Sequence, residues 1–152
     1  MEEIYLGLGS NLGDSKATLL AAFERLALLL AEARISSFWR SRARYYADQP
    51  DFVNAVVSGK TGLSPRELLA AVNAIEAEFG RNRSAEIRKG PRPLDIDILL
   101  YGRRLIAESD LIIPHAALRE RKFALLPLLE LAPGLEDPAS GAPYASILAS
   151  LP

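Results

Sequence analysis

The chain has 152 residues and a formal net charge of −1, with 18 lysines and arginines against 19 aspartates and glutamates. It has no cysteine and one histidine, which excludes disulfides, thiolate metal centres and multi-histidine zinc sites. The charge balance lacks the basic excess of a nucleic-acid binder, and the longest apolar run, residues 26–31, is too short to span a bilayer. We therefore expect one globular domain over residues 1–152, cytoplasmic and without a signal peptide, that binds neither nucleic acid nor membranes.

The first half of the chain predicts three strands and one helix. Asp14 is a suitable N-cap for that helix, whose leucines and phenylalanine form one broad apolar stripe. The strands are apolar runs, and the polar stretch at residues 40–51 predicts a loop. In chain order, we expect a strand at 4–9, a helix at 15–30, and strands at 35–39 and 52–57.

The second half begins with a strong helix start. Ser64 caps, Pro65 takes the first helical position and Glu67 closes a capping box, while Gly80 ends the helix. Glycine and prolines predict a loop at 81–93, and an alternating pattern predicts a strand at 94–100. Prolines then punctuate a C-terminal part of short helices and turns.

The resulting order is strand, helix, strand, strand, helix, strand. This order predicts an α/β (α+β) fold in which a ferredoxin-like split βαβ sheet is covered by helices, followed by a short helical C-terminal part.

Asp95 and Asp97 lie on one face of the last predicted strand. We expect the alternate residues Leu94, Ile96, Ile98 and Leu100 to face the core. The two aspartates are then about 7 Å apart, and their charges repel by about 2 kcal/mol at an effective dielectric near 20. A divalent cation would reverse that unfavourable energy. The alternative is two solvated carboxylates on an exposed strand face.

The loop before this strand is rich in basic residues. Five of them fall within twelve positions: Arg81, Arg83, Arg88, Lys89 and Arg92. Guanidinium groups beside metal-binding carboxylates are suited to a polyphosphate, because they bind its oxygens in bidentate fashion. The alternative is a solvated basic loop.

Other polar and aromatic residues are less specific. The glycines of residues 7–13 fit neither the dinucleotide fingerprint nor the Walker A pattern, so we interpret this segment as a structural turn. His115 follows a proline and has Arg121 and Phe123 just beyond it. Phe52 and Asn54 share one strand face, and asparagine is depleted in strands, which indicates recognition of a polar ligand.

These motifs resemble those of the 6-hydroxymethyl-7,8-dihydropterin pyrophosphokinases of folate biosynthesis. The strongest stretch is Gly-Pro-Arg-Pro-Leu-Asp-Ile-Asp-Ile-Leu at 90–99, together with Asp-Gln-Pro-Asp-Phe-Val-Asn-Ala-Val at 48–56. Further matching segments are residues 9–13, 36–37, 75–76, 80–83, 113–115 and 120–123. The chain departs from the family in the loop 41–47, which lacks Thr-Pro and a nearby glycine, and at Lys89, where the family often has tryptophan.

The resemblance implies an enzyme that transfers pyrophosphate from ATP to the pterin hydroxymethyl group, giving AMP and the pterin diphosphate. It implies catalytic roles for Arg81, Arg92, Asp95 and Asp97, with both aspartates holding two Mg²⁺ ions on ATP. It implies ATP contacts from Glu76, Arg83, Arg92, the backbone at Ile98, His115 and Arg121. It implies pterin contacts from Ser41, Ala43, Arg44, Asn54, and Phe52 and Phe123 on either side of the ring.

Two other functions remain open at this point. One is a non-enzymatic ferredoxin-like module that binds a nucleotide or RNA, and the other is an ordinary kinase that releases ADP. We expect the protein to be a monomer whose partners are ATP and the pterin.

Overall fold

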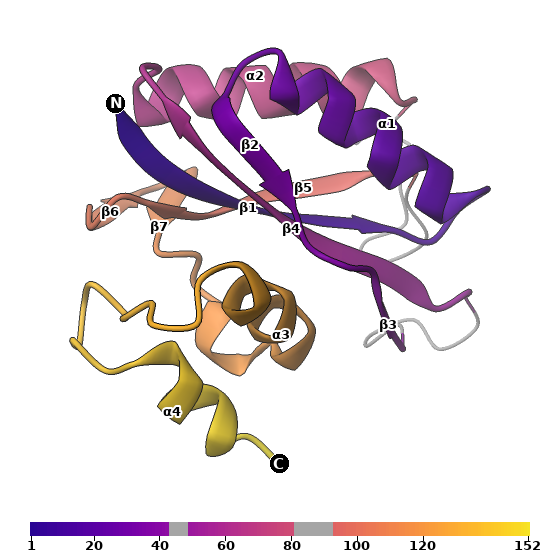
Figure 1. The fold of residues 1–152 in the computed structure, drawn as a ribbon. Helices are drawn as coiled ribbons and strands as arrows, with labels where there is room; N and C mark the ends of the chain where they lie inside the picture. The colour runs from indigo at the N-terminus through magenta and orange to yellow at the C-terminus, as the bar shows by residue number, and fades with distance from the viewer. Residues whose placement is uncertain (43–48, 81–92) are drawn as a thin grey trace.

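The computed structural model describes residues 1–42, 49–80 and 93–152 (Figure 1). The elements of its α/β body, in chain order, are β1 (Glu2–Ser10), α1 (Ser15–Ala27), β2 (Ala31–Ile35), β3 (Trp39–Ser41), β4 (Phe52–Thr61), α2 (Pro65–Glu78) and β5 (Asp95–Tyr101). The C-terminal part holds β6 (Ile106–Glu108), β7 (Leu111–Ile113), the 3₁₀ turn η1 (Leu118–Glu120), α3 (Lys122–Leu131) and α4 (Tyr144–Ala149). Among these helices none is long and apolar enough to cross a lipid bilayer.

The main sheet of the described chain has the strand order β2-β4-β1-β5, and β3 pairs with β4 as a continuation of the β2 side. β1 and β2 are both antiparallel to β4, which lies between them, and α1 connects them. In the same way, α2 connects β4 to β5 across β1. The predicted α/β class is therefore confirmed, and the connectivity is compatible with the split βαβ plan.

Helices cover the two faces of the sheet unequally. α1 and α2 lie along one face, α3 lies against part of the other, and α4 packs against α3 (Figure 1). Each face has its own apolar cluster: Leu6, Leu19 and Leu68 belong to the first, and Val56, Leu125 and Tyr144 belong to the second. All six of these side chains are completely buried.

A β-bulge interrupts the alternation of β5. Tyr5 lies opposite Leu100 and Leu6 lies opposite Ile98, which leaves Leu99 as the extra residue. Leu94, Ile96 and Ile98 are buried in the first cluster as expected, but Leu100 lies in the second. The prediction that Leu100 shares their face is wrong, because strict alternation does not allow for an inserted residue.

The strand expected at 35–39 is also misplaced. β2 ends at Ile35 and β3 begins at Trp39, and Ser36 lies between them with its side chain buried. The Ser36 hydroxyl accepts a hydrogen bond from the Val56 N–H at 2.9 Å, and this bond replaces a strand partner. Apolar residues lie on both sides of Ser36 and Ser37, so the sequence pattern alone joined two short strands into one.

Three further boundaries differ from those expected. α1 ends at Ala27, not at residue 30, and Leu30 turns inward to pack against Gly59. β3 occupies the start of the stretch expected to be loop, and β4 continues to Thr61. The C-terminal part contains the β6–β7 hairpin, which was not expected there.

Asp137 organises the turn that brings α4 onto α3. Its side chain is 2% exposed and accepts hydrogen bonds from the Ser140 hydroxyl at 2.8 Å and the Ala139 N–H at 3.1 Å. Burial raises the pKa of Asp137, but these donors and Arg119, 3.5 Å away, outweigh that effect and leave the pKa below its usual range. Asp137 therefore stays ionised inside the protein near neutral pH.

We expect Asp137→Ala to lower the free energy of unfolding by about 2 kcal/mol, because it removes a buried acceptor that binds the Ser140 hydroxyl, the Ala139 N–H and the hydroxyl of the buried Tyr144. The stabilisation by the ionised carboxylate is present above the unfolded-state pKa and is lost as the pH falls through the lower folded-state pKa. Denaturant unfolding at pH 7 and in acid measures both effects. The exposed neighbour Glu136, changed to Ala, is the control, and equal losses for the two variants would contradict the assignment.

Candidate active site

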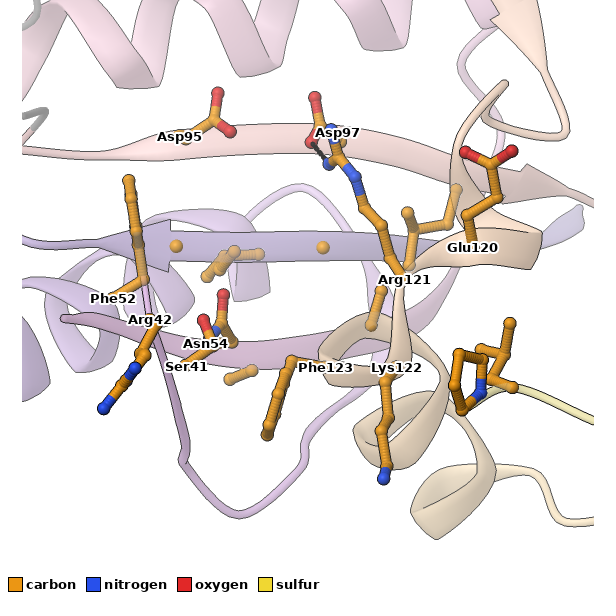
Figure 2. Close-up of a pocket in the computed structure, with 18 residues that line it drawn as sticks. Ser41, Arg42, Phe52, Asn54, Asp95, Asp97, Glu120, Arg121, Lys122 and Phe123 are labelled. Carbon is orange, nitrogen blue, oxygen red and sulfur yellow. Dashed lines mark hydrogen bonds and ion pairs between the residues drawn. The ribbon is translucent and has the colours of Figure 1, made fainter. Parts of the chain in front are cut away.

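A cavity of about 440 Å³ opens on the sheet face that α3 and α4 only partly cover. β1, β3, β4 and β5 contribute its floor and walls, and the start of α3 forms the opposite wall (Figure 2). Leu151 and Pro152 also line it. Residues from widely separated parts of the sequence therefore meet at this one place.

Two glycines of the central strand β1 form the floor. Gly9 lies between Asp95 of β5 and Asn54 of β4, and Gly7 lies next to Asp97 of β5. A Cβ atom at Gly9 would lie 3.6 Å from Asn54 Oδ1, and one at Gly7 would lie 3.3 Å from the Leu99 side chain. Because neither position has a side chain, the cavity extends down to the backbone between the aspartates and Asn54.

Only the second part of the Gly-rich segment is the expected structural turn. Gly13 has φ +69°, which favours glycine, and the Asn11 amide donates hydrogen bonds to Gln49 Oε1 at 2.7 Å and to the Pro50 carbonyl at 3.0 Å. This turn therefore holds the chain just before Phe52. Gly7 and Gly9, in contrast, belong to a strand and to the cavity.

Asp95 and Asp97 project from the same side of β5, as the alternation predicts (Figure 2). An Arg121 guanidinium nitrogen lies 3.5 Å from Asp97 Oδ2, and His115 Nε2 lies 3.7 Å from Asp97 Oδ1. Both contacts are partly exposed. The structure thus brings two predicted nucleotide contacts, His115 and Arg121, to one of the two predicted metal ligands.

Two hydrogen bonds orient His115. The backbone N–H of His115 donates to the carbonyl of the bulged Leu99 at 3.0 Å, and its side-chain Nδ1 accepts from the Ala117 N–H at 3.1 Å. Because Nδ1 is an acceptor, the proton of the neutral imidazole is on Nε2, which faces Asp97. The β-bulge therefore helps to aim this side chain.

Glu76 lies on α2, on the opposite side of β5 from the cavity. Its side chain is 1% exposed, and Oε2 accepts a hydrogen bond from the Ile96 N–H at 2.8 Å. This bond marks the outer edge of β5, which pairs with β1 alone in the part of the chain that the structure describes. Ile98, two residues on, presents its backbone to the same edge.

The aromatic residues and Asn54 face the cavity from different elements. Phe52 comes from β4 and Phe123 from the start of α3, and the latter is 38% exposed. The Asn54 nitrogen donates to the Trp39 carbonyl at 3.1 Å and to Ser41 Oγ at 2.7 Å. A carbonyl only accepts, so these bonds fix the orientation of the amide and leave Oδ1 over Gly9 as the acceptor.

Most of the predicted site residues that the structure describes line the cavity. They are Ser41, Phe52, Asn54, Asp95, Asp97, Arg121 and Phe123. His115 joins them through Asp97, whereas Glu76 and Ile98 lie at the outer edge of β5. Five predicted residues lie outside the described ranges: Ala43, Arg44, Arg81, Arg83 and Arg92.

The cavity also contains residues that had no predicted role. Arg42, Glu120 and Lys122 line it, together with Leu99, Leu151 and Pro152. Glu120 and Lys122 flank Arg121 in sequence, and this position next to a predicted site residue could have indicated that they lie at the cavity. No pattern in the sequence pointed to the C-terminal residues, because only the packing of α4 brings them there.

We expect Asp97→Asn, without divalent cations, to lower the free energy of unfolding by less than about 1 kcal/mol, because its contacts with Arg121 and His115 are long and partly exposed. Carboxylate repulsion alone would instead predict no change or a small gain. Chemical denaturation in EDTA measures the difference, with the exposed Glu24→Gln on α1 as control. A loss of several kcal/mol would show that Asp97 is mainly structural.

A family model and several known proteins match this chain, and they point to the same family. The family model described as 7,8-dihydro-6-hydroxymethylpterin-pyrophosphokinase (HPPK) matches residues 5–133. The "2-amino-4-hydroxy-6-hydroxymethyldihydropteridine pyrophosphokinase" of Pseudomonas aeruginosa is 42% identical over 155 residues, which cover 100% of this chain and 93% of that protein. The protein of the same name from Aquifex aeolicus is 41% identical over 138 residues, covering 91% and 85% respectively.

Some relatives are much longer. The "Folic acid synthesis protein fol1" of Pneumocystis carinii is 41% identical over 146 residues, which cover 95% of this chain but only 20% of that protein. A crystal structure of a Plasmodium falciparum HPPK-DHPS triple mutant superposes with a TM-score of 0.78 at 14% identity, over 97% of this chain and 44% of that one. At this identity the second likeness supports the fold alone.

The family model covers most of the chain, and the bacterial relatives align with it over nearly their whole length. The chain therefore belongs to the 7,8-dihydro-6-hydroxymethylpterin-pyrophosphokinase (HPPK) family.

Proposed function

We propose that this chain is an ATP-dependent pyrophosphokinase that forms AMP and the pterin diphosphate from ATP and 6-hydroxymethyl-7,8-dihydropterin, a step of folate synthesis. The observation that carries the proposal is one cavity with two chemically different ends. Paired aspartates lie at one end, and two phenylalanines with an oriented asparagine lie at the other. The first end suits phosphate and metal, and the second suits a flat heterocycle.

The pterin ring is proposed to lie between Phe52 and Phe123. Offset stacking on aromatic rings stabilises a planar ligand by about 1 kcal/mol beyond the area that it buries. Asn54 Oδ1 is available as an acceptor for the N–H groups at the polar edge of the pterin, because the Asn54 nitrogen is already used. Ser41 supports that amide, so its role here is to orient Asn54; Ala43 and Arg44 are proposed to contribute from the adjoining segment.

Asp95 and Asp97 fit a magnesium site that is completed by phosphate. Mg²⁺ prefers oxygen ligands and in nucleotide sites uses one or two carboxylates together with phosphate oxygens and water. The two carboxylates share one strand face at the cavity wall, which meets this requirement. We propose two Mg²⁺ ions here, which when bound neutralise charge on the phosphates.

The nucleotide is proposed to occupy the side of the cavity toward the outer edge of β5. There, the Ile98 backbone offers hydrogen-bonding groups, and buried Glu76 fixes the strand edge beside it. Arg121 and His115 are within reach of phosphates held at Asp97. Arg81, Arg83 and Arg92 are proposed to bind the remaining phosphate charge.

In the proposed reaction, the hydroxyl oxygen of the pterin attacks the β-phosphorus of ATP. The new O–P bond forms as the bond from the β-phosphorus to the bridging oxygen of AMP breaks, and the hydroxyl proton leaves to solvent. The residues support this reaction by positioning and by neutralising charge, and no protein nucleophile is required. Because the family is one of enzymes, the alternative of a non-enzymatic binding module is not favoured.

We expect incubation with ATP, Mg²⁺ and 6-hydroxymethyl-7,8-dihydropterin to give AMP and the pterin diphosphate in equal amounts. Addition of excess EDTA should stop the reaction, because the aspartates then have no ion with which to hold the phosphates. Chromatography of the nucleotides and pterins measures both products. Formation of ADP and a pterin monophosphate would instead indicate attack at the γ-phosphorus.

We expect Phe123→Ala to weaken pterin binding by about fivefold or more, because it removes one stacking surface. Binding of a non-hydrolysable ATP analogue should remain unchanged. Titration calorimetry with each ligand separates the two effects. Leu20→Ala, which removes an exposed apolar side chain from α1 on the far face of the sheet, is the control. Equal weakening of both ligands would count against a ring sandwich.

A further inference from the structure

Glu130, near the end of α3, binds a distant segment between β2 and β3. Its Oε2 accepts a hydrogen bond from the Ser37 N–H at 2.7 Å, and its Oε1 accepts from Ser37 Oγ at 2.5 Å. Oε1 also accepts from Trp39 Nε1 at 3.3 Å. One carboxylate thus gathers three donors from residues more than 90 positions away in sequence.

The Glu130 carboxylate is ionised at neutral pH. The Ser37 hydroxyl, followed by the Ser37 N–H and Trp39, holds the pKa of Glu130 below its ordinary value. Hydrogen bonds to a charged acceptor are stronger than neutral ones. Both Glu130 and Ser37 are exposed, however, so this contact adds little to the overall stability of the fold.

Trp39 connects this contact to one wall of the cavity. It pairs with Asn54 across β3 and β4, and its carbonyl accepts from the Asn54 amide at 3.1 Å. Trp39 therefore takes part in both contacts: its indole binds Glu130, and its backbone carbonyl orients Asn54. Displacement of Trp39 would remove one of the two bonds that fix that amide.

The opposite wall of the cavity is formed by the start of α3, the helix that also contains Glu130. Phe123 lies at the start of α3, seven residues before Glu130. Seven residues are close to two helical turns, or about 10.5 Å, so both side chains lie on the same side of α3. Glu130 and Phe123 thus belong to one ten-residue helix, in which Pro127 lies between them, and a shift of this helix at Glu130 also moves the element that carries Phe123.

We propose that Glu130 is a positioning residue for the pterin site: its contacts with Ser37 and Trp39 set the separation and alignment of Asn54 on β4 and Phe123 on α3. This inference rests on the proposed function of the cavity. Glu130 does not itself line the cavity, so it acts through these two residues. A planar ligand held between two walls binds tightly only when both are spaced to fit it.

The contact itself can be tested without any ligand, because Trp39 is the only tryptophan of the chain. We expect Glu130→Ala to lower the fluorescence anisotropy of Trp39, since the indole loses its acceptor. Glu32→Gln is the matched control, because it removes an exposed carboxylate that binds Lys60 at 2.7 Å elsewhere on the sheet. Unchanged anisotropy in Glu130→Ala would overturn the inference.

The positioning role is tested with the whole protein, Mg²⁺ and a non-hydrolysable ATP analogue. We expect Glu130→Ala to raise the Kd for 6-hydroxymethyl-7,8-dihydropterin about tenfold and to leave the Kd for the analogue within about twofold. Glu130→Gln should be intermediate, because its carbonyl still accepts from Ser37. Ser37→Ala combined with Glu130→Ala should raise the pterin Kd less than the product of the single effects.

The outcomes separate the two claims. If the wild-type protein binds pterin and Glu130→Ala binds it with the same Kd, the positioning role alone is overturned. The same holds if Glu130→Ala weakens the binding of pterin and of the ATP analogue equally. A wild-type protein that binds no pterin overturns the proposed function, and with it this role, even if Trp39 still loosens in Glu130→Ala. A thermal melt of each variant, expected to shift by only a few degrees, shows that the fold is retained.

Discussion

The site depends on the absence of side chains at two positions of the central strand. Gly7 and Gly9 of β1 face the α3 side, with the β5 aspartates next to them on one side and β4 residues, Asn54 among them, on the other. A larger residue at either position would fill the space between the two ends of the cavity. The pairing register of β1 therefore controls both the depth of the cavity and which functional groups face one another across it.

The two faces of the sheet differ in how far they are covered by helices and in how apolar they are. The face under α1 and α2 is closed by a continuous apolar cluster and provides most of the core. The other face is apolar only where α3 and α4 cover it, around Val56 and Leu99, and becomes polar beyond that cover. A ligand that binds there meets a rigid floor, because each floor strand is held by a neighbour and by the core beneath it.

The edges of the sheet and its irregularities place the remaining groups. The carbonyl of the bulged Leu99 accepts a hydrogen bond from the His115 backbone N–H. At the outer edge of β5, the Glu76 side chain accepts one from the Ile96 N–H. Arg66 on α2 pairs with Asp110 at 2.8 Å, which ties the β6–β7 hairpin to the main body just before His115. These contacts join residues that are distant in sequence, and they hold β5 and the segment that leads to His115 in place.

The sequence alone determined the order of the main elements, the shared face of Asp95 and Asp97, and the family, because caps, alternation and short motifs are local signals. It could not show the bulge that moves Leu100, or the break at Ser36, because both depend on which strand becomes the neighbour. It also gave no sign that Glu130 and Trp39 meet, or that Leu151 reaches the cavity. Only the tertiary structure decided these contacts, since hydrogen bonds and packing between distant residues follow from strand pairing and helix docking and leave no periodic pattern.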